Sequence, residues 1–358
     1  MTRTGRRGRG RLTLQCGKIL RPGALHEVTG GANGRAYCSR IPNTSHGARR
    51  NRGLPDFSSY IRHMLRVLIF FVTCVACTAN AQSALRDEIT TRIARDSGAV
   101  VGVAFHDLGN ADTVHVLADS SFHAASTMKV PVMIELYRQS EQGALPLDRG
   151  VLLVNRFASI ADGSFYSLDR GRDSDSSLYD RVGTRIPARE LMQLMIRRSS
   201  NLATNVLIAT VGADPVNSTA RRLGASRIRV LRGVEDIAAF DRGMNNTTTA
   251  RDLAILLNAI ASPGVVSASS RAEMIEVLLG QEFNDEIPAG LPPGTKVAHK
   301  TGQITRVLHD AAIVYPEGRA PYILVVLTRN IADEKVAQRL IADIARLVHA
   351  SAMRSVAR

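Results

Sequence analysis

The placement of predicted strands constrains the fold of this chain most. Residues 99–108 and 113–118 read as two strands joined by a Gly-Asn turn, and residues 311–315 and 322–328 read as two more around a Pro-Glu-Gly turn. Two strands joined by a short turn are antiparallel. One antiparallel sheet built from both ends of residues 82–358 is therefore predicted.

The region between the two strand pairs is predicted to be helical. Thr249 and Asp252 form a capping-box pattern, and apolar residues follow at helical spacing. We therefore expect an α/β (α+β) fold: the antiparallel sheet with flanking helices, plus an all-helical lobe at roughly residues 126–260, with the site in the cleft between them. Residues 158–186, rich in Gly, Asp and Ser, read as a long loop or lid. The other predicted helices are 84–96, 126–139, 187–195, 201–211 and 333–353.

The positive charge of the chain is concentrated before residue 82. Residues 1–81 hold 14 of the 46 Lys and Arg residues but only two acidic residues, which leaves a net charge of +2 out of +14 for residues 82–358. The folded part has no basic stripe interleaved with aromatic residues, as a nucleic-acid interface would. We therefore expect no nucleic-acid partner.

Residues 64–81 have the three parts of a secretory signal peptide. Arg66 supplies a positive start, residues 67–76 are apolar, and Ala79-Asn80-Ala81 forms an A-x-A cleavage site. The apolar run is too short to span a bilayer as a permanent helix. We therefore expect no stable membrane span once the signal peptide is cleaved. The alternative is that the segment is retained as an anchor. The sequence predicts a secreted or periplasmic protein.

The predicted cleavage separates a leader from one folded domain. Residues 1–63 read as a basic segment, either disordered or the product of a start codon assigned upstream of Met64. All four cysteines precede the cleavage site, so residues 82–358 can be neither a thiol enzyme nor a zinc-thiolate protein. These cysteines are Cys16, Cys38, Cys74 and Cys77.

Ser126 and Lys129 form an S-x-x-K motif at the start of a predicted helix. The lysine lies one turn after the serine and returns to the same face. A buried lysine amine with a lowered pKa can accept a serine proton. The alternative is a helix-capping serine followed by a solvated lysine.

Two further motifs follow in a fixed order. Ser199-Ser200-Asn201 offers a hydroxyl to carry a proton and an amide to hold a substrate, or else a helix cap. Lys300-Thr301-Gly302 offers a charge for a carboxylate and a glycine that lets a substrate approach a strand, or else an exposed strand end. With S-x-x-K, the three motifs predict serine acyl transfer with a lysine base.

The stretches STMK (126–129), RRSSNLATNVL (197–207) and HKTG (299–302) resemble class A β-lactamases, within the wider group of serine β-lactamases and penicillin-binding proteins. The resemblance covers most of residues 84–350. It implies the β-lactamase/transpeptidase-like fold. It also implies a monomeric enzyme that needs no cofactor or metal and hydrolyses a small-molecule β-lactam.

The same resemblance implies a role for each motif residue. Ser126 would be acylated, Lys129 would accept its proton, and Ser199 would pass a proton to the β-lactam nitrogen. Asn201 would bind the acylamide side chain, and Lys300 and Thr301 the substrate carboxylate. The oxyanion hole would be formed by the backbone N–H groups of Ser126 and Gln303.

The resemblance further requires a glutamate that activates water for deacylation. Glu235, 36 residues after Ser199, is the candidate. Its surroundings depart from the family pattern, which has an asparagine at the position of Ala239 and an arginine–aspartate clasp near Gly233 and Asn246. Ser200 also stands where aspartate is usual.

Two other functions remain open from the sequence. One is a penicillin-binding-protein-like serine peptidase or esterase that acts on cell-wall peptides or esters and releases β-lactams slowly. The other is a non-catalytic β-lactam-binding or sensor domain. His299, His309 and Asp310 contain the residue types of a catalytic triad, but nothing in the sequence places them around a nucleophile.

Overall fold

The computed structural model of the protein describes residues 81–354. The predicted leader, the signal peptide up to residue 80 and all four cysteines lie outside these residues, so the boundaries proposed for them stay predictions. No helix in the described part of the chain is long and apolar enough to cross a membrane.

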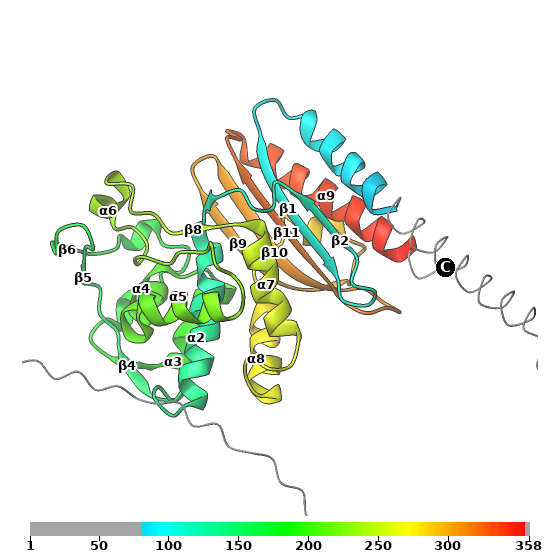
Figure 1. The fold of residues 1–358 in the computed structure, drawn as a ribbon. Helices are drawn as coiled ribbons and strands as arrows, with labels where there is room; N and C mark the ends of the chain where they lie inside the picture. Colours follow the sequence, from blue (N-terminus) through cyan, green and yellow to red (C-terminus); the bar gives the residue numbers. More distant parts are fainter. Residues whose placement is uncertain (1–80, 355–358) are drawn as a thin grey trace, which may run out of the picture. The chain divides into compact units, whose positions relative to one another are not determined.

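A five-stranded antiparallel sheet joins the two ends of the described chain (Figure 1). Its strand order is β2-β1-β11-β10-β9, and β1 pairs with β11 in a register that sets Val103 opposite Val326. The fold class expected from the sequence is confirmed. The strands are β1 (Val100–Asp107), β2 (Thr113–Val116), β9 (Lys296–Ile304), β10 (Val307–Tyr315) and β11 (Tyr322–Arg329).

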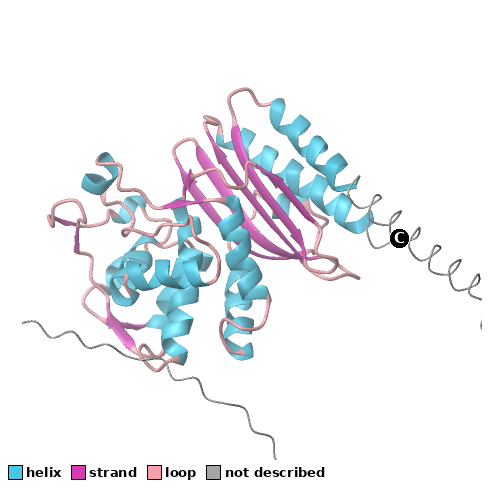
Figure 2. Cartoon of the chain, in the orientation of Figure 1, coloured by secondary structure: helices cyan, strands magenta, loops and turns pink. Residues whose placement is uncertain are grey.

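Helices cover both faces of this sheet (Figure 2). Residues 81–94 and α9 (Glu334–Arg354) lie on one face, and α7 (Ala250–Ala261) lies on the other. Side chains alternate between two cores along β11: Leu324 and Val326 belong to the core under α9, whereas Val325 belongs to the core shared with the helical lobe. A strand buried on both faces reads as a continuous apolar run, as 322–328 does.

The helical lobe is built around α2 (Lys129–Glu141), whose residues from Lys129 to Tyr137 are all buried. The predicted helix start at Ser126 is wrong by three residues, because Ser126 belongs to the 3-10 turn η1 (Ala125–Met128). The lobe continues past residue 260 to α8. Its other helices are α3 (Ala188–Arg197), α4 (Asn201–Val211), α5 (Ala213–Arg222), α6 (Ile237–Asp241) and α8 (Ala268–Leu279).

Residues 158–186, predicted as a long loop, carry only short elements. The 3-10 turns η2 (Arg170–Arg172) and η3 (Tyr179–Arg181) lie within it. The short strands of the lobe are β3 (Phe122–His123), β4 (Gly150–Leu152), β5 (Phe157–Ala158), β6 (Phe165–Tyr166), β7 (Arg185–Pro187) and β8 (Thr247–Thr248).

Gly290 ends the 3-10 turn η4 (Pro288–Gly290), where the backbone lies directly against α9. A Cβ at this position would overlap the carbonyl oxygen of Ala342. Gly290→Ala is therefore expected to lower the free energy of unfolding by about 1–3 kcal/mol. Urea unfolding measures this. Gly171→Ala, whose Cβ would meet only Asp169 Oδ1 at 3.4 Å, is the control and should stay within about 0.5 kcal/mol; equal stability of both variants would contradict the packing.

Candidate active site

The S-x-x-K serine lies on a tight turn beside the edge of the sheet. Ala125, just before it, has φ 45°, a left-handed conformation that is costly for a residue with a Cβ. A Cβ at Gly302 would lie 3.1 Å from the backbone nitrogens of Ser126 and Thr127, so glycine lets β9 approach this turn. Ser126 is half-buried, and its hydroxyl has no hydrogen-bond partner among residues 81–354.

Lys129 is fully buried at the first residue of α2. Its Nζ donates to Ser199 O at 2.6 Å, to Ser199 Oγ at 3.0 Å and to Asn201 Oδ1 at 3.2 Å. Burial, followed by the nearby charge of Lys300, lowers the pKa of Lys129 well below its ordinary value. The first two motifs therefore meet, and the amine is suited to act as a base.

Ser199 sits between two lysine amines. It has φ 57°, and its Oγ accepts from Lys129 Nζ at 3.0 Å and from Lys300 Nζ at 3.2 Å. A hydroxyl that accepts twice still has its own proton to donate. The structure therefore brings Ser199, which the sequence predicted to carry a proton, into contact with both motif lysines.

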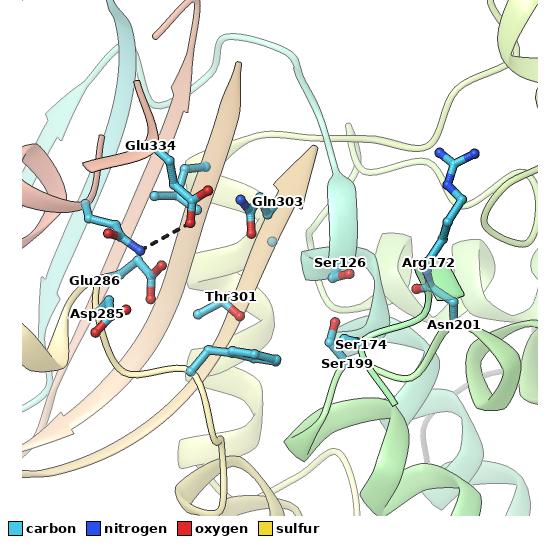
Figure 3. A pocket seen from close by; sticks show the side chains of 14 residues that line it. Ser126, Arg172, Ser174, Ser199, Asn201, Asp285, Glu286, Thr301, Gln303 and Glu334 are labelled. Atoms are coloured by element: carbon cyan, nitrogen blue, oxygen red, sulfur yellow. Dashed lines mark hydrogen bonds between the residues drawn. The ribbon is translucent and has the colours of Figure 1, made fainter. Parts of the chain in front are cut away.

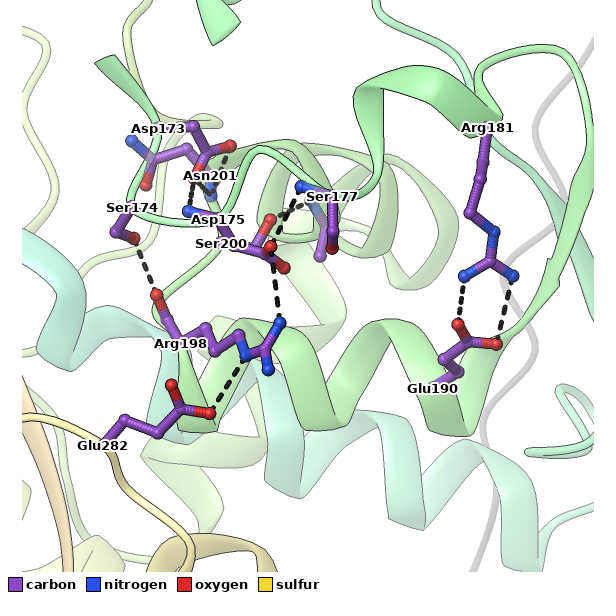
Figure 4. Close-up of polar contacts among 11 residues, drawn as sticks. Asp173, Ser174, Asp175, Ser177, Arg181, Glu190, Arg198, Ser200, Asn201 and Glu282 are labelled. Atoms are coloured by element: carbon purple, nitrogen blue, oxygen red, sulfur yellow. Dashed lines mark hydrogen bonds and ion pairs between the residues drawn. The ribbon is translucent and has the colours of Figure 1, made fainter. Parts of the chain in front are cut away.

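The N-terminus of α4 is held by a residue that the sequence analysis missed. Ser200 caps the helix through Ala203 N at 3.3 Å. The carboxylate of Asp173 accepts from the backbone N–H groups of Asn201 and Leu202, each at 2.9 Å (Figure 4). A carboxylate is favourable at a helix N-terminus. Asp173 of the 158–186 loop thus supplies a carboxylate beside position 200, where the family has an aspartate and this chain has Ser200. The polar composition of the loop was the only sign of this contact in the sequence.

The same loop is tied to the helical lobe by side-chain contacts. Ser174 Oγ donates to Arg198 O at 2.7 Å, and the Arg198 guanidinium lies 3.8 Å from Asp175 and 2.9 Å from Glu282 (Figure 4). These contacts fix residues 173–175 as a wall beside the S-x-N motif.

Asn201 links the base to the glutamate. Its Oδ1 accepts from Lys129, and its Nδ2 donates to Glu235 Oε1 at 2.9 Å. The amide predicted to bind an acylamide group thus also positions Glu235. The spacing argument that singled out Glu235 led to a residue that the fold does bring into the site.

The backbone around Glu235 is held on both sides. Glu235 has φ 60°. The Asn205 amide bonds Val234 N at 2.6 Å and Val234 O at 3.0 Å, and the Asp236 carboxylate accepts from Ser159 Oγ at 2.7 Å. Gly233 lies so close to this amide that a Cβ would be 2.5 Å from Asn205 Oδ1. Packing against Asn205 therefore leaves no room for a side chain at position 233, near which the sequence analysis looked for the arginine–aspartate clasp.

The neck of this loop is closed without an arginine–aspartate ion pair. Asn246 Oδ1 accepts from Leu231 N at 2.8 Å, and Asn246 Nδ2 donates to Arg232 O at 3.0 Å. The buried Arg232 guanidinium donates to Met244 O at 2.9 Å and to Asn245 Oδ1 at 3.0 Å. Arg232, one residue before Gly233, thus closes the neck of the loop by hydrogen bonds, in place of the arginine–aspartate ion pair that the sequence lacks.

Lys300 is a fully buried residue of β9, and its Nζ donates to Ser199 Oγ at 3.2 Å and to Thr301 O at 3.0 Å. Burial lowers the pKa of Lys300 to about 7, against the attraction of Asp310 and Glu286. At neutral pH this amine therefore titrates, and it can hold an anion when charged.

The histidines do not form a triad with a serine. His299 Nδ1 lies 2.9 Å from Asp310 Oδ1, and its Nε2 faces Asn284 Oδ1 at 3.2 Å. His309 Nε2 lies 2.8 Å from His123 O, and burial lowers the pKa of His309 to about 4. Both rings serve the buried packing of β9 and β10.

Ser126 lies where two hollows meet. One, of about 390 Å³, reaches from Ser126 and Ser199 past Thr301, Gly302 and Gln303 (Figure 3). The other, of about 400 Å³, reaches from Ser126 to Glu235. The nucleophile can thus face a substrate that extends in both directions, and every residue predicted for the site lies in one hollow, in both, or directly behind them.

Comparison with known proteins identifies the family to which this chain belongs. The model of the β-lactamase enzyme family matches residues 84–352. The chain belongs to the β-lactamase enzyme family. It is thereby a member of the serine β-lactamase and penicillin-binding-protein superfamily, and a hydrolase by family.

Relatives and solved structures agree with this assignment. β-Lactamase AST-1 of Nocardia asteroides is 30% identical over 77% of this chain and 87% of its own, and the carbapenem-hydrolyzing β-lactamase KPC of Klebsiella oxytoca is 27% identical over 75% and 90%. The structure of PBP-A is similar with a TM-score of 0.66, 25% identity and coverage of 76% and 96%. An ancestral class A β-lactamase is similar in fold, with a TM-score of 0.64, 24% identity and coverage of 75% and 99%.

Proposed function

We propose that this protein is a serine β-lactamase that hydrolyses the β-lactam amide through an acyl-enzyme on Ser126. The observation that carries the proposal is the buried Lys129 amine, which contacts both Ser199 and Asn201 beside the serine turn. A lysine held in this way has the lowered pKa that a general base needs. The predicted signal peptide supports action in the periplasm or outside the cell.

Acylation would use Ser126 as the nucleophile, Lys129 as the base and Ser199 as the proton donor. Ser126 Oγ attacks the lactam carbonyl carbon while Lys129 Nζ takes its proton, and the C–N bond then breaks as Ser199 gives its proton to the leaving nitrogen. Ser199 regains a proton from Lys129. A neutral lysine has two protons and a lone pair, so Lys129 gives up one of its three present bonds; such contacts rearrange when substrate binds.

The negative charge that forms on the carbonyl oxygen needs donors. The backbone N–H groups of Ser126 and Gln303 would supply them, since Gly302 brings β9 against the serine turn. Each such donor contributes about 3–4 kcal/mol to stabilising the transition state in comparable sites.

Deacylation would depend on Glu235 as the base for water. Asn201 holds its carboxylate at 2.9 Å, which supports this role. The position where the family has a second amide for the water is Ala239, whose methyl group is buried and cannot bond.

The missing amide favours a second candidate, an enzyme that is acylated readily and releases the product slowly, as a cell-wall peptidase or esterase does. One structure similar to this chain is a mutant of PBP-A in an acyl-enzyme complex with penicillin-G, with a TM-score of 0.66. Measured rates of release separate the two candidates.

The proposal is tested by incubating the purified protein with a chromogenic cephalosporin while turnover and intact mass are followed. Steady turnover is expected, and Ser126→Ala should abolish both turnover and any adduct because it removes the hydroxyl that would be acylated, on the turn next to the buried Lys129 base. A stable adduct without turnover would instead favour the second candidate. Neither adduct nor turnover would refute both enzymatic functions.

Glu235→Gln keeps the shape of the side chain but removes the base. Acylation should proceed, and steady turnover should fall by about 100-fold or more, the usual contribution of a general base. Mass spectrometry should show the accumulated adduct. Glu317→Gln, in the exposed turn after β10, is the matched control. Parental turnover in Glu235→Gln would exclude this base.

The charge of Lys300 should set the alkaline side of the pH profile for an anionic β-lactam. With a pKa of about 7, the amine is charged below that pH and neutral above it, and Glu286, with a pKa of about 8, adds a repelling charge at still higher pH. kcat/KM should therefore fall from pH 7 to 9. Lys300→Arg, which stays charged, should move the fall to above pH 8; a flat profile in the parent protein would contradict this.

A further inference from the structure

Three carboxyl groups line one wall of the hollow that contains Ser126, Ser199 and Thr301. Asp285 and Glu286 come from the loop after α8, and Glu334 is the first residue of α9. Figure 3 shows them on the side of the pocket opposite Arg172 and Asn201. Asp285 and Glu334 are exposed, whereas Glu286 is buried with 4% of its surface accessible.

The buried carboxyl group of Glu286 is incompletely paired. Its Oε2 has no hydrogen-bond partner although it is shielded from bulk water. A buried polar atom without a partner costs roughly 1–3 kcal/mol. Burial first, and then the charges of Asp310 and Asp285, raise the pKa of Glu286 to about 8, against a hydrogen bond from Gln338. The buried Glu286 carboxyl group therefore lowers the stability of the fold, and no contact within the described residues offsets this for Oε2.

The three carboxyl groups of this wall form no ion pair with the described residues, although Lys300 lies near enough to attract Glu286. No ion pair within residues 81–354 includes Asp285, Glu286 or Glu334. The buried Lys300 directs its Nζ to Ser199 Oγ and Thr301 O instead. Nor do the described residues contain a group of three or more His, Cys, Asp or Glu side chains that could hold a metal ion. The wall is thus acidic, and a positive charge on a ligand would be attracted to it.

The wall lies on the leaving-group side of the reaction. Ser199, which would protonate the leaving nitrogen, and Thr301 line the same hollow. Gln303, Leu308 and Glu334 also line a neighbouring hollow of about 390 Å³. Space for a substituent on the leaving half of the substrate thus continues past the carboxyl groups. The hollow that contains Glu235 would take the acyl half of the substrate instead.

We propose that Glu286, with Asp285 and Glu334, forms a subsite for a primary ammonium group carried by the leaving half of the substrate. This inference rests on the proposed acyl-transfer function. The carboxylate of the leaving half would face Lys300, and the ammonium would donate to the Glu286 carboxylate after a rotation of that side chain turns the buried Oε2 toward the hollow. The two exposed carboxylates would attract the ammonium into the hollow. The preferred substrate is thus zwitterionic in its leaving half, a β-lactam or an acyl-amino acid with a side-chain amine.

The experiment uses two chromogenic cephalosporins that differ in one group. In one, the 3-substituent ends in a primary ammonium, and in the other this amine is acetylated. Binding of both is measured by calorimetry with full-length Ser126→Ala protein, which cannot be acylated, at about pH 9, where Glu286 with its pKa of about 8 is ionised and a primary amine is still charged. Hydrolysis of both is measured with the parent protein. The ammonium form should bind at least about tenfold more tightly, the size of a hydrogen bond to a charged group.

Glu286→Gln in the Ser126→Ala background should remove that preference, because an amide cannot supply the negative charge. Glu317→Gln is the matched control, with the same change of type and charge in the exposed turn after β10, and should keep the preference. Thermal unfolding verifies that each variant is folded, and Asp285→Asn with Glu334→Gln, two exposed changes, should weaken the preference without disturbing the core.

The outcomes separate this inference from the proposed function. Equal binding of the two compounds, or a preference that survives Glu286→Gln, overturns the ammonium subsite. A preference that Glu286→Gln abolishes supports it, whether or not the parent protein hydrolyses either compound. Absence of hydrolysis and of an adduct for both compounds in the parent protein refutes the proposed function alone.

Discussion

The buried amine of Lys129 is the interaction on which the site depends. It joins the start of α2 to the segment before α4 through three bonds, to the carbonyl and hydroxyl of Ser199 and to the amide of Asn201. An unpaired buried lysine would be costly, so these partners and the lysine stabilise each other's positions. The same burial that costs stability lowers the pKa of the amine and makes it a base.

The sheet holds the other half of the site in place. β1 and β11, which come from opposite ends of the described chain, pair over their full length and bury both faces. β10 and β9 add to this pair, and β9 presents Lys300, Thr301 and Gly302 to the serine turn. A rigid strand against a buried helix start keeps reacting groups in position, which is what acyl transfer needs.

Three strained backbone positions and one unpartnered buried oxygen lie at the active-site cleft. Ala125, Ser199 and Glu235 each have positive φ without being glycine, and Glu286 keeps a buried oxygen without a partner. Conformations and groups of this kind persist only where the surroundings hold them, and they are typical of functional sites. Here Ala125 and Glu235 line the second hollow and Ser199 and Glu286 the first, and both hollows meet at Ser126.

The sequence by itself determined the elements and the motifs. Apolar runs such as 322–328 and the capping box at Thr249 are local signals, and the stretches 126–129, 197–207 and 299–302 carry the resemblance to the family. Only the tertiary structure decided which distant groups meet: Asp173 at the start of α4, Asn205 against Gly233, Arg232 across the neck of the Glu235 loop, and the unpaired Glu286 in the hollow of Ser126. These contacts join residues far apart in the chain or depend on burial, and no local pattern of residue types encodes either.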